Sequence, residues 1–220
     1  MCTVIVRTGL PLTLLGVRDE YTDRPWEAPG EHWPEHPGVL GGRDLKAGGT
    51  WLAVHPAARR AAALLNGHGV PAPEAVRTSR GDLALRAAAT GDLPGPDLTR
   101  YDPFHLVLAE AGRARLASWD GVRLTTADLP DGTSMIVNTG LDPAHPRVAA
   151  HLPRFAAASP SAAGWRELAA GEPSSAPESL LVRHETPGGR VFASLSIMRV
   201  TLDTDGVTYD FTDLTADRDR

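Results

Sequence analysis

The chain has one cysteine, Cys2, and one lysine, Lys46. A single cysteine cannot form an internal disulfide, which predicts a fold that forms in a reducing compartment. No segment reaches the roughly 20 apolar residues that a membrane-spanning helix needs. The apolar run Leu10–Leu15 is short, is interrupted by Pro11 and lacks a signal-peptide cleavage site. We therefore expect a cytoplasmic protein with no stable insertion in a membrane.

A basic surface is also lacking, because the net charge is −5. The sequence offers no stripe of cations for a phosphate backbone, so we expect no nucleic-acid partner. His32 and His36 have helical spacing, but Pro34 and Pro37 prevent the helix that would align them, and we expect no metal site. The content of 42% hydrophobic and 22% charged residues is that of an ordinary globular chain. We expect a single domain over residues 1–220, with a frayed tail at about 214–220.

Short β-rich runs separated by Gly-containing turns dominate the pattern and predict antiparallel hairpins. Helices are expected in the main over Pro73–Thr90, over Pro146–Ala158 with strain or a break at Pro153, and over Pro160–Ala170. Residues 22–49 are expected to form a loop because prolines and glycine pairs interrupt them. The expected strands are Thr3–Arg7, Leu12–Arg18, Thr50–His55, Ala61–Asn66, Phe104–Glu110, Arg113–Trp119, Val122–Thr126, Thr133–Asn138, Ser179–His184, Val191–Leu202 and Val207–Phe211. Strand runs with helices grouped between them favour an α+β fold.

Cys2 is the candidate nucleophile because of its position. Removal of Met1 would place a free α-amine, with an ordinary pKa near 8, on the same residue as a thiol with an ordinary pKa near 8.5. Such an amine can act as the general base for its own side chain, as in N-terminal nucleophiles. The alternative is that Cys2 is an inert, small core residue.

The first hairpin brings Arg18 and Asp19 towards Cys2. If Arg7 lies opposite Leu12, Cys2 lies opposite Val17, and a shift of one residue places it opposite Arg18. Either register puts Arg18 and Asp19 within roughly 5–8 Å of Cys2. Neighbouring strand residues point to opposite faces, so only one of the pair should face the site unless a bulge intervenes. The alternative is a surface Arg–Asp pair at a strand end.

Short motifs follow one another along the chain in an order that is specific when taken together. They are Met1-Cys2-Thr3, Arg18-Asp19-Glu20, Arg24-Pro25, Gly41-Gly42-Arg43-Asp44, Gly48-Gly49-Thr50-Trp51-Leu52, Asn66, Ser79-Arg80-Gly81-Asp82-Leu83, Tyr101 with Phe104, and Ile136-Val137-Asn138. This set resembles the NRDE-motif proteins of the Transport and Golgi Organisation family. The resemblance covers about two thirds of the chain and is strongest over residues 1–85.

The resemblance implies a four-layer αββα sandwich of the N-terminal-nucleophile hydrolase type, similar to bile acid hydrolases and penicillin V acylases. It implies Cys2 as the nucleophile, with Arg18 and Asp19 in contact with it. Asn66 and Asn138 become candidates for oxyanion or substrate-amide contacts, although either could instead be a turn residue whose side chain holds a loop. The expected function is hydrolysis of an amide or acyl bond of a small molecule.

Three further residues are candidates for substrate binding. Trp51 could line a cleft or pack the long loop onto the core. His68, between two glycines, could approach a ligand such as haem iron or simply occupy a turn. His105 stands where asparagine often occurs in the family, and Val17 stands where the motif has asparagine. These departures leave open altered specificity, a loss of activity, or a carrier that binds haem or an acyl lipid in the same cleft without catalysis. Otherwise no cofactor is expected.

Overall fold

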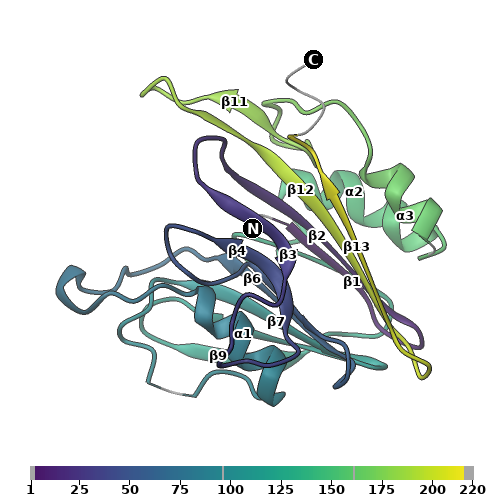
Figure 1. Cartoon of the computed structure of the whole chain (residues 1–220). Helices are drawn as coiled ribbons and strands as arrows, with labels where there is room; N and C mark the ends of the chain where they lie inside the picture. Colours follow the sequence, from purple (N-terminus) through teal and green to yellow (C-terminus); the bar gives the residue numbers. More distant parts are fainter. Residues whose placement is uncertain (1–2, 96, 161, 216–220) are drawn as a thin grey trace.

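The computed structural model describes residues 3–95, 97–160 and 162–215. Cys2 and residues 216–220 of the predicted tail lie outside the described residues. Within them the chain forms two antiparallel β-sheets and three α-helices (Figure 1). The prediction of a mixed chain of helices and mainly antiparallel sheets is therefore confirmed.

The first sheet has β1 and β2 at its centre and carries the start of the described chain. Its order is β10-β1-β2-β12-β11, and β13 also pairs with β12. These strands span Thr3–Arg7 (β1), Leu12–Tyr21 (β2), Thr133–Val137 (β10), Arg183–Glu185 (β11), Val191–Leu202 (β12) and Val207–Asp213 (β13). A register shift between Ser194 and Ser196 marks a bulge in β12 where it pairs with β2.

The second sheet is a meander of sequential strands, in the order β3 to β9. They span Trp26–Gly30 (β3), Leu40–Asp44 (β4), Leu52–His55 (β5), Arg60–Asn66 (β6), Phe104–Glu110 (β7), Arg113–Trp119 (β8) and Leu124–Asp128 (β9). Each strand pairs antiparallel with the next along the chain, and α1 lies in the long connection between β6 and β7.

The two sheets face each other, and helices cover their outer faces (Figure 1). One apolar cluster fills the space between the sheets, with Val4 and Leu14 against Leu52 and Leu65. A second cluster lies under α1 (Gly81–Thr90), and a third joins the first sheet to α2 (Pro146–Ala157) and α3 (Ala162–Ala169). Alternation along β1 and β2 explains this arrangement, because even-numbered residues face the other sheet and odd-numbered residues face α2 and α3.

Several sequence predictions were wrong in detail, among them the strand Ser179–His184, where the structure has β11 only over Arg183–Glu185. Residues 22–49 contain β3 and β4 rather than only loop. Pro29 is tolerated because β3 is an edge strand whose pairing with β4 shifts between Glu27 and Gly30. The helix predicted over Pro73–Thr90 is reduced to a short 3-10 turn, Glu74–Val76, followed by α1. In contrast, α2 continues through Pro153 without a break.

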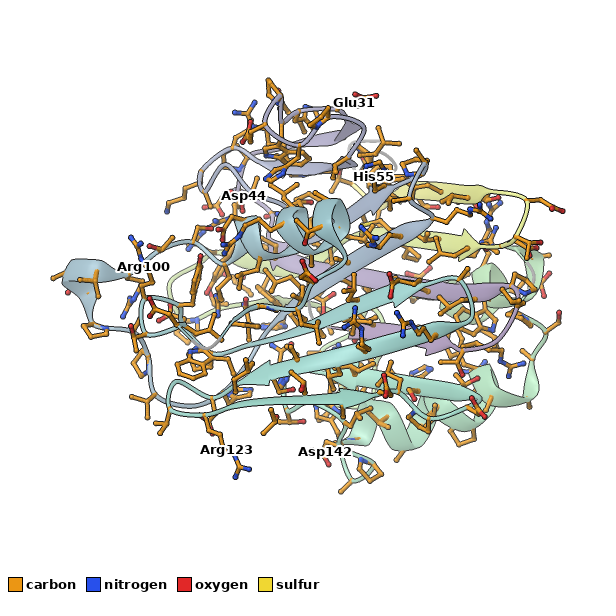
Figure 2. All side chains as sticks on the ribbon, turned by 90° about the horizontal axis from the view of Figure 1, so that it is seen from below. Glu31, Asp44, His55, Arg100, Arg123 and Asp142 are labelled. Atoms are coloured by element: carbon orange, nitrogen blue, oxygen red, sulfur yellow. The ribbon has the colours of Figure 1, made fainter. Side chains whose placement is uncertain are left out.

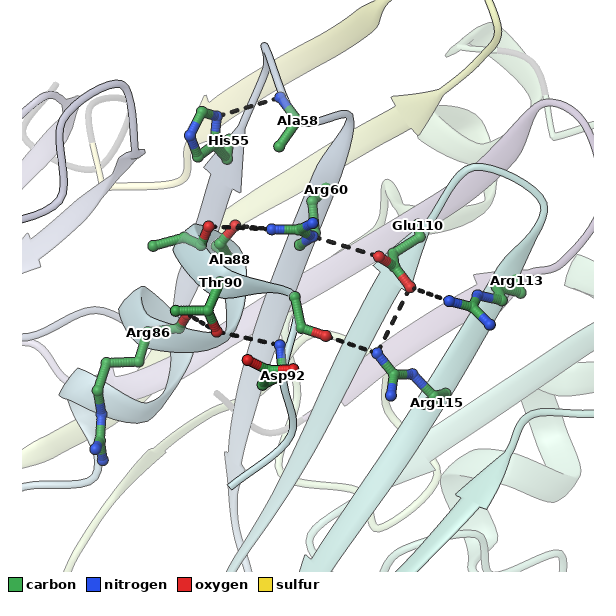
Figure 3. Close-up of polar contacts among 12 residues, drawn as sticks. His55, Ala58, Arg60, Arg86, Ala88, Thr90, Asp92, Glu110, Arg113 and Arg115 are labelled. Atoms are coloured by element: carbon green, nitrogen blue, oxygen red, sulfur yellow. Dashed lines mark hydrogen bonds and ion pairs between the residues drawn. The ribbon is translucent and has the colours of Figure 1, made fainter. Parts of the chain in front are cut away.

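Arginine side chains anchor the C-terminal end of α1 to the second sheet (Figure 3). Arg60 on β6 donates from Nη1 to the carbonyl oxygens of Ala88 and Ala89, each at 3.1 Å, and Arg115 donates to Gly91 O at 2.7 Å. Glu110 on β7 pairs with both arginines, at 3.4 and 3.6 Å. Cations at the carbonyl end of a helix satisfy its last acceptors and its dipole. The anchor at the C-terminal end of α1 restrains the whole helix. The N-terminal end of α1 lies at a cleft described below.

Candidate functional site

The start of β1 lies between two other strands of the first sheet. Thr3 pairs with Val17 on β2 and with Val137 on β10. The first register considered from the sequence is therefore wrong, since Arg7 lies opposite Thr13, and the register shifted by one residue is confirmed. The residues that follow Val17 and Val137 along the chain are Arg18, within β2, and Asn138, directly after β10.

Arg18 is buried between the two sheets, with 2% of its surface exposed. Its guanidinium carbon lies 4.0 Å from the ring centroid of Trp51 and 5.7 Å from that of Trp26. The two indole rings meet edge to face with centroids 6.0 Å apart. A cation on the face of a tryptophan is stabilised electrostatically, and more strongly when it is shielded from water. The alternative of a surface Arg–Asp pair is therefore wrong for this arginine.

The Trp51 ring is held over β4 by a glycine. A Cβ atom on Gly42 would lie 2.4 Å from Cζ2 of Trp51, so no side chain fits there. The indole Nε1–H of Trp51 donates to Sδ of Met198 at 2.9 Å. The Gly41-Gly42 pair of the sequence is thus explained by a close approach between a backbone and the ring on which Arg18 rests.

Gly42→Ala is expected to lower the free energy of unfolding by about 1–3 kcal/mol, because the added methyl must displace the Trp51 ring. Urea denaturation followed by tryptophan fluorescence measures this change. Gly188→Ala is the matched control, since a Cβ there meets nothing within 4 Å. The control should stay within about 0.5 kcal/mol of the parent protein. Equal stability of both variants would contradict the packing described for Trp51.

Asp19 faces the opposite side of the sheet from Arg18 and belongs to a buried polar cluster. Its Oδ1 accepts a hydrogen bond from Ser194 Oγ at 2.6 Å, and its Oδ2 lies 3.4 Å from Nη1 of Arg147 on α2. The same Nη1 donates to Thr3 Oγ1 at 2.7 Å. Val182 N donates to Ser194 Oγ at 2.9 Å. The cluster therefore ties the start of β1 to β2, β12 and α2.

Asn138 directly follows β10 and connects the two sheets. Its carbonyl oxygen lies 3.2 Å from Nε2 of His105 on β7, whose Nδ1 is 2.8 Å from Ser118 Oγ. Within the described part of the chain, the buried Oδ1 atom of Asn138 has no hydrogen-bond partner. One polar atom of the Asn138 side chain is therefore unpaired among the described residues, whereas both ring nitrogens of His105 contact protein atoms.

Burial lowers the pKa of His105, and a hydrogen bond to Asn138 O opposes this effect in part. The folded protein therefore binds a proton at this ring less readily than the unfolded chain does. The contribution of His105 to stability is fully present above its ordinary pKa of about 6.5 and is lost as the pH falls towards the lowered value. Burial also lowers the pKa of His151.

We expect His105→Gln to reduce the loss of stability between about pH 7.5 and pH 5, because the variant has no buried imidazole to protonate. Urea denaturation at the two pH values provides the measurement. His151→Gln should remove a separate part of the same acid sensitivity, and the double variant should be the least sensitive. An unchanged pH dependence in His105→Gln would contradict the assignment.

A polar cleft of about 840 Å³ opens beside Arg18 and Trp51. Asn66, at the end of β6, lines this cleft, and its side chain makes no hydrogen bond to any other described residue. Asp44, labelled in Figure 2, also lines it. The cleft is larger than two other cavities that predicted site residues line.

The other predicted site residues line smaller cavities. Asp19, Asn138 and His68 line a cavity of about 370 Å³ together with Arg147. His68 and Asn138 also meet His105 in a cavity of about 280 Å³. The structure therefore groups Arg18, Trp51 and Asn66 at one cavity and separates them from the histidines.

Sequence reasoning missed Arg147 and Ser194 as members of the site. Each is distant in sequence from Asp19 and lies in a segment without a recognisable motif. The only local signal for Arg147 is that it precedes the apolar face that begins at Val148 of α2. Arg80 appears in the motif Ser79-Arg80-Gly81-Asp82-Leu83, but nothing in that motif indicates that the side chain enters a cleft.

The sequence matches the family described as Transport and Golgi organisation 2 over residues 1–167. The chain belongs to this family. The resemblance inferred from the short motifs is thereby confirmed, and the matched region contains both sheets up to β10 together with α2. No curated protein sequence matches the chain significantly.

The matched region of this Transport and Golgi organisation 2 chain includes Arg18, Asp19, Asn66, Asn138 and Arg147. Ser194 and the strands β11 to β13 lie beyond it. No helix among the described residues is long and apolar enough to span a membrane. In the same described ranges, no group of three or more His, Cys, Asp or Glu side chains is arranged to hold a metal ion.

Proposed function

We propose that the protein is an N-terminal cysteine amidohydrolase that cleaves an amide or related acyl bond of a small molecule. The proposal requires removal of Met1, which would make Cys2 the first residue. It also requires Cys2, which is bonded to Thr3, to continue the pairing of β1 by one residue. In that position its neighbours across the two flanking strands would be Arg18 and Asn138.

The pairing of Thr3 with Val17 and Val137 carries this proposal. Consecutive Cα atoms are about 3.8 Å apart, so Cys2 would be placed beside both flanking strands if it continues the pairing of β1. The buried cluster of Asp19, Arg147 and Ser194 restrains Thr3 further. A nucleophile needs such a rigid support, because a small displacement of the attacking atom greatly lowers the reaction rate.

The fold supports the same proposal. Helices on the outer faces of two facing sheets are what a four-layer αββα sandwich requires. We propose that the chain has the N-terminal-nucleophile form of this sandwich. Alternation along β1 would direct the side chain of residue 2 between the sheets, towards the face on which Arg18 lies.

In the proposed reaction the α-amine of Cys2 takes the thiol proton, and Sγ attacks the carbonyl carbon of the substrate. Arg18 would stabilise the thiolate, and Nδ2 of Asn138 would donate to the developing oxyanion. Collapse of the tetrahedral intermediate breaks the C–N bond, and the amine leaves with the proton held by the α-ammonium. Water, deprotonated by the α-amine, then hydrolyses the thioester and regenerates the thiol.

Acylation by p-nitrophenyl butyrate tests the proposal. We expect a burst of one p-nitrophenolate per protein chain and a butyryl adduct that peptide mass spectrometry assigns to Cys2. Cys2→Ala should abolish both. A chain with one alanine inserted before Cys2 is the matched control, because it keeps the thiol and moves the α-amine to another residue. A burst of equal rate in this control would contradict the α-amine as the general base. A burst in Cys2→Ala would contradict Cys2 as the nucleophile.

A carrier for haem or an acyl lipid in the same cleft is less well supported, because charged side chains contribute much of the cleft lining. An apolar cavity of about 330 Å³ lies elsewhere, between α3 and the outer face of β12, with Leu15, Leu181 and Ile197 in its wall. Haem titration of Cys2→Ala separates the two functions. A Soret shift at stoichiometric haem would favour the carrier.

A further inference from the structure

The cleft beside Arg18 has an excess of basic side chains, although the whole chain has a net charge of −5. Its lining includes three acidic residues, Glu20, Asp44 and Asp102. The basic residues of the lining are Arg18, Arg24, Lys46, Arg77 and Arg80. A concave site with one excess sign of charge concentrates ligands of the opposite sign.

The acidic residues of the cleft are engaged by two of the arginines. Arg24 lies 2.6 Å from Oδ2 of Asp44 and 3.7 Å from Oε2 of Glu20. The Arg24 side chain and two backbone N–H groups lower the pKa of Asp44, against the effect of its burial. Arg77 lies 3.2 Å from Oδ1 of Asp102. These two arginines balance two of the three carboxylates, and the five basic and three acidic residues of the lining leave it with a net charge of +2.

Arg80 has no carboxylate within ion-pair distance among the described residues, and it is half-buried. One of its nitrogens, Nη1, donates to Pro103 O at 2.7 Å, and the structure shows no acceptor for its other N–H groups among the described residues. Burial lowers its pKa, the nearby Asp102 opposes this effect, and Arg77 adds to it. A cation that is partly removed from water without a counterion is a strong receptor for an oxyanion.

Lys46 lines the same cleft as Arg80, from the loop between β4 and β5. The loop that carries it packs against the first residue of α1, where Thr50 N donates to Gly81 O at 3.1 Å. A Cβ atom on Gly49 would lie 2.5 Å from the carbonyl carbon of Gly81, which shows how closely the two backbones approach. Lys46 is exposed and forms no ion pair with any described residue. Arg80 and Lys46 therefore each contribute a positive charge to the lining of the cleft.

We infer that the cleft takes a substrate that carries a carboxylate or phosphate group, bound by Arg80 and Lys46, with its scissile bond placed towards Arg18. This inference rests on the proposed function for the identity of the reacting end. The inference of an anion-binding end depends only on the residues that line the cleft. A charged group held away from the scissile bond would orient the substrate and provide binding energy for the reaction.

Calorimetric titration with butyl phosphate, butyrate and butyramide tests the anion-binding end. At about 20 mM salt we expect at least one of the two anions to bind and butyramide to bind more than tenfold more weakly. Comparison of the two anions distinguishes a phosphate site from a carboxylate site. Arg80→Gln should weaken anion binding at least tenfold, and Lys46→Gln should weaken it several-fold. Arg166→Gln, which removes an exposed cation that lines a different cavity, should leave it unchanged.

Butyramide binding as tight as that of the anions would overturn the inference, as would unchanged anion affinity in both cleft variants. Arg80→Lys keeps the charge and guards against a folding defect in Arg80→Gln, and it should retain part of the affinity. Lys46 is exposed, so Lys46→Gln should fold normally.

Turnover separates this inference from the proposed function. Succinyl-p-nitroanilide and butyryl-p-nitroanilide have acyl groups of the same length and differ by a terminal carboxylate. If the inference holds for the carboxylate, kcat/KM should be at least tenfold higher for the succinyl compound, and Arg80→Gln should abolish the preference. Equal turnover of both compounds, with no preference for a phosphate-bearing analogue, would overturn the inference and leave the hydrolase intact. Anion binding without acylation of Cys2 would overturn the hydrolase and leave the anion site intact.

Discussion

Asp19→Ala is expected to lower the free energy of unfolding by about 3–5 kcal/mol, because it leaves the guanidinium of Arg147 buried without its carboxylate. The side chain of Asp19 is 1% exposed and that of Arg147 is 10% exposed. The substitution also removes the acceptor of the hydrogen bond from Ser194 Oγ. Urea denaturation followed by tryptophan fluorescence gives the change in unfolding free energy.

The double variant Asp19→Ala/Arg147→Met is the matched control. It removes both charges and should recover a large part of the lost stability, because a buried pair replaced by apolar side chains is often close to neutral. Arg190 and Asp23 form an exposed pair at 2.7 Å, so Asp23→Ala should cost at most about 1 kcal/mol. A loss of that small size in Asp19→Ala would show that the buried cluster does not hold the start of β1.

Arg18→Gln is expected to slow alkylation of Cys2 by iodoacetamide about tenfold at neutral pH. If Arg18 lies beside the thiol as proposed, its loss raises the thiol pKa by about one unit or more and lowers the fraction of thiolate. The rate measured from about pH 5 to pH 10 gives the apparent pKa. Because Cys2 is the only cysteine of the chain, the alkylation signal has a single source.

Arg24→Gln is the control for this experiment. Arg24 lines the same cleft but pairs with Asp44 and Glu20, so its loss should leave the rate profile of Cys2 nearly unchanged. Identical profiles for Arg18→Gln and the parent protein would contradict the proposed role of Arg18. A shift that is equally large in Arg24→Gln would indicate a general effect of charge in the cleft.

The local elements of the fold that could be predicted from sequence are those with strong turn chemistry. Asp120-Gly121 ends β8 as expected, with Oδ1 of Asp120 accepting from the backbone N–H groups of Val122 and Arg123. The strands β3 and β4 could not be predicted in the same way. Pro29 and the pair Gly41-Gly42 disfavour strands locally, and only the edge position of β3 and the contact of Gly42 with Trp51 make them compatible with a sheet.

The sequence could predict the candidate site only for residues that lie close together along the chain. Alternation along β2 correctly predicts that Arg18 and Asp19 face opposite sides of the sheet. The sequence does not decide between the two registers of the hairpin, because a four-residue turn does not specify the pairing. Arg147 and Ser194 approach Asp19 through tertiary packing, so no spacing in the sequence indicates them. The excess positive charge of the cleft arises from three separate segments, those of Arg18, Lys46 and Arg80, which only the folded chain brings together.

The mass of the intact protein, expressed from its own start codon, tests the central proposal most directly. A nucleophile that uses its own α-amine must be the first residue of the chain. We expect a mass lower than that of the full sequence by one methionine, with Cys2 identified as the first residue by fragmentation. A protein that retains Met1 would contradict the proposed mechanism, whatever the reactivity of its thiol.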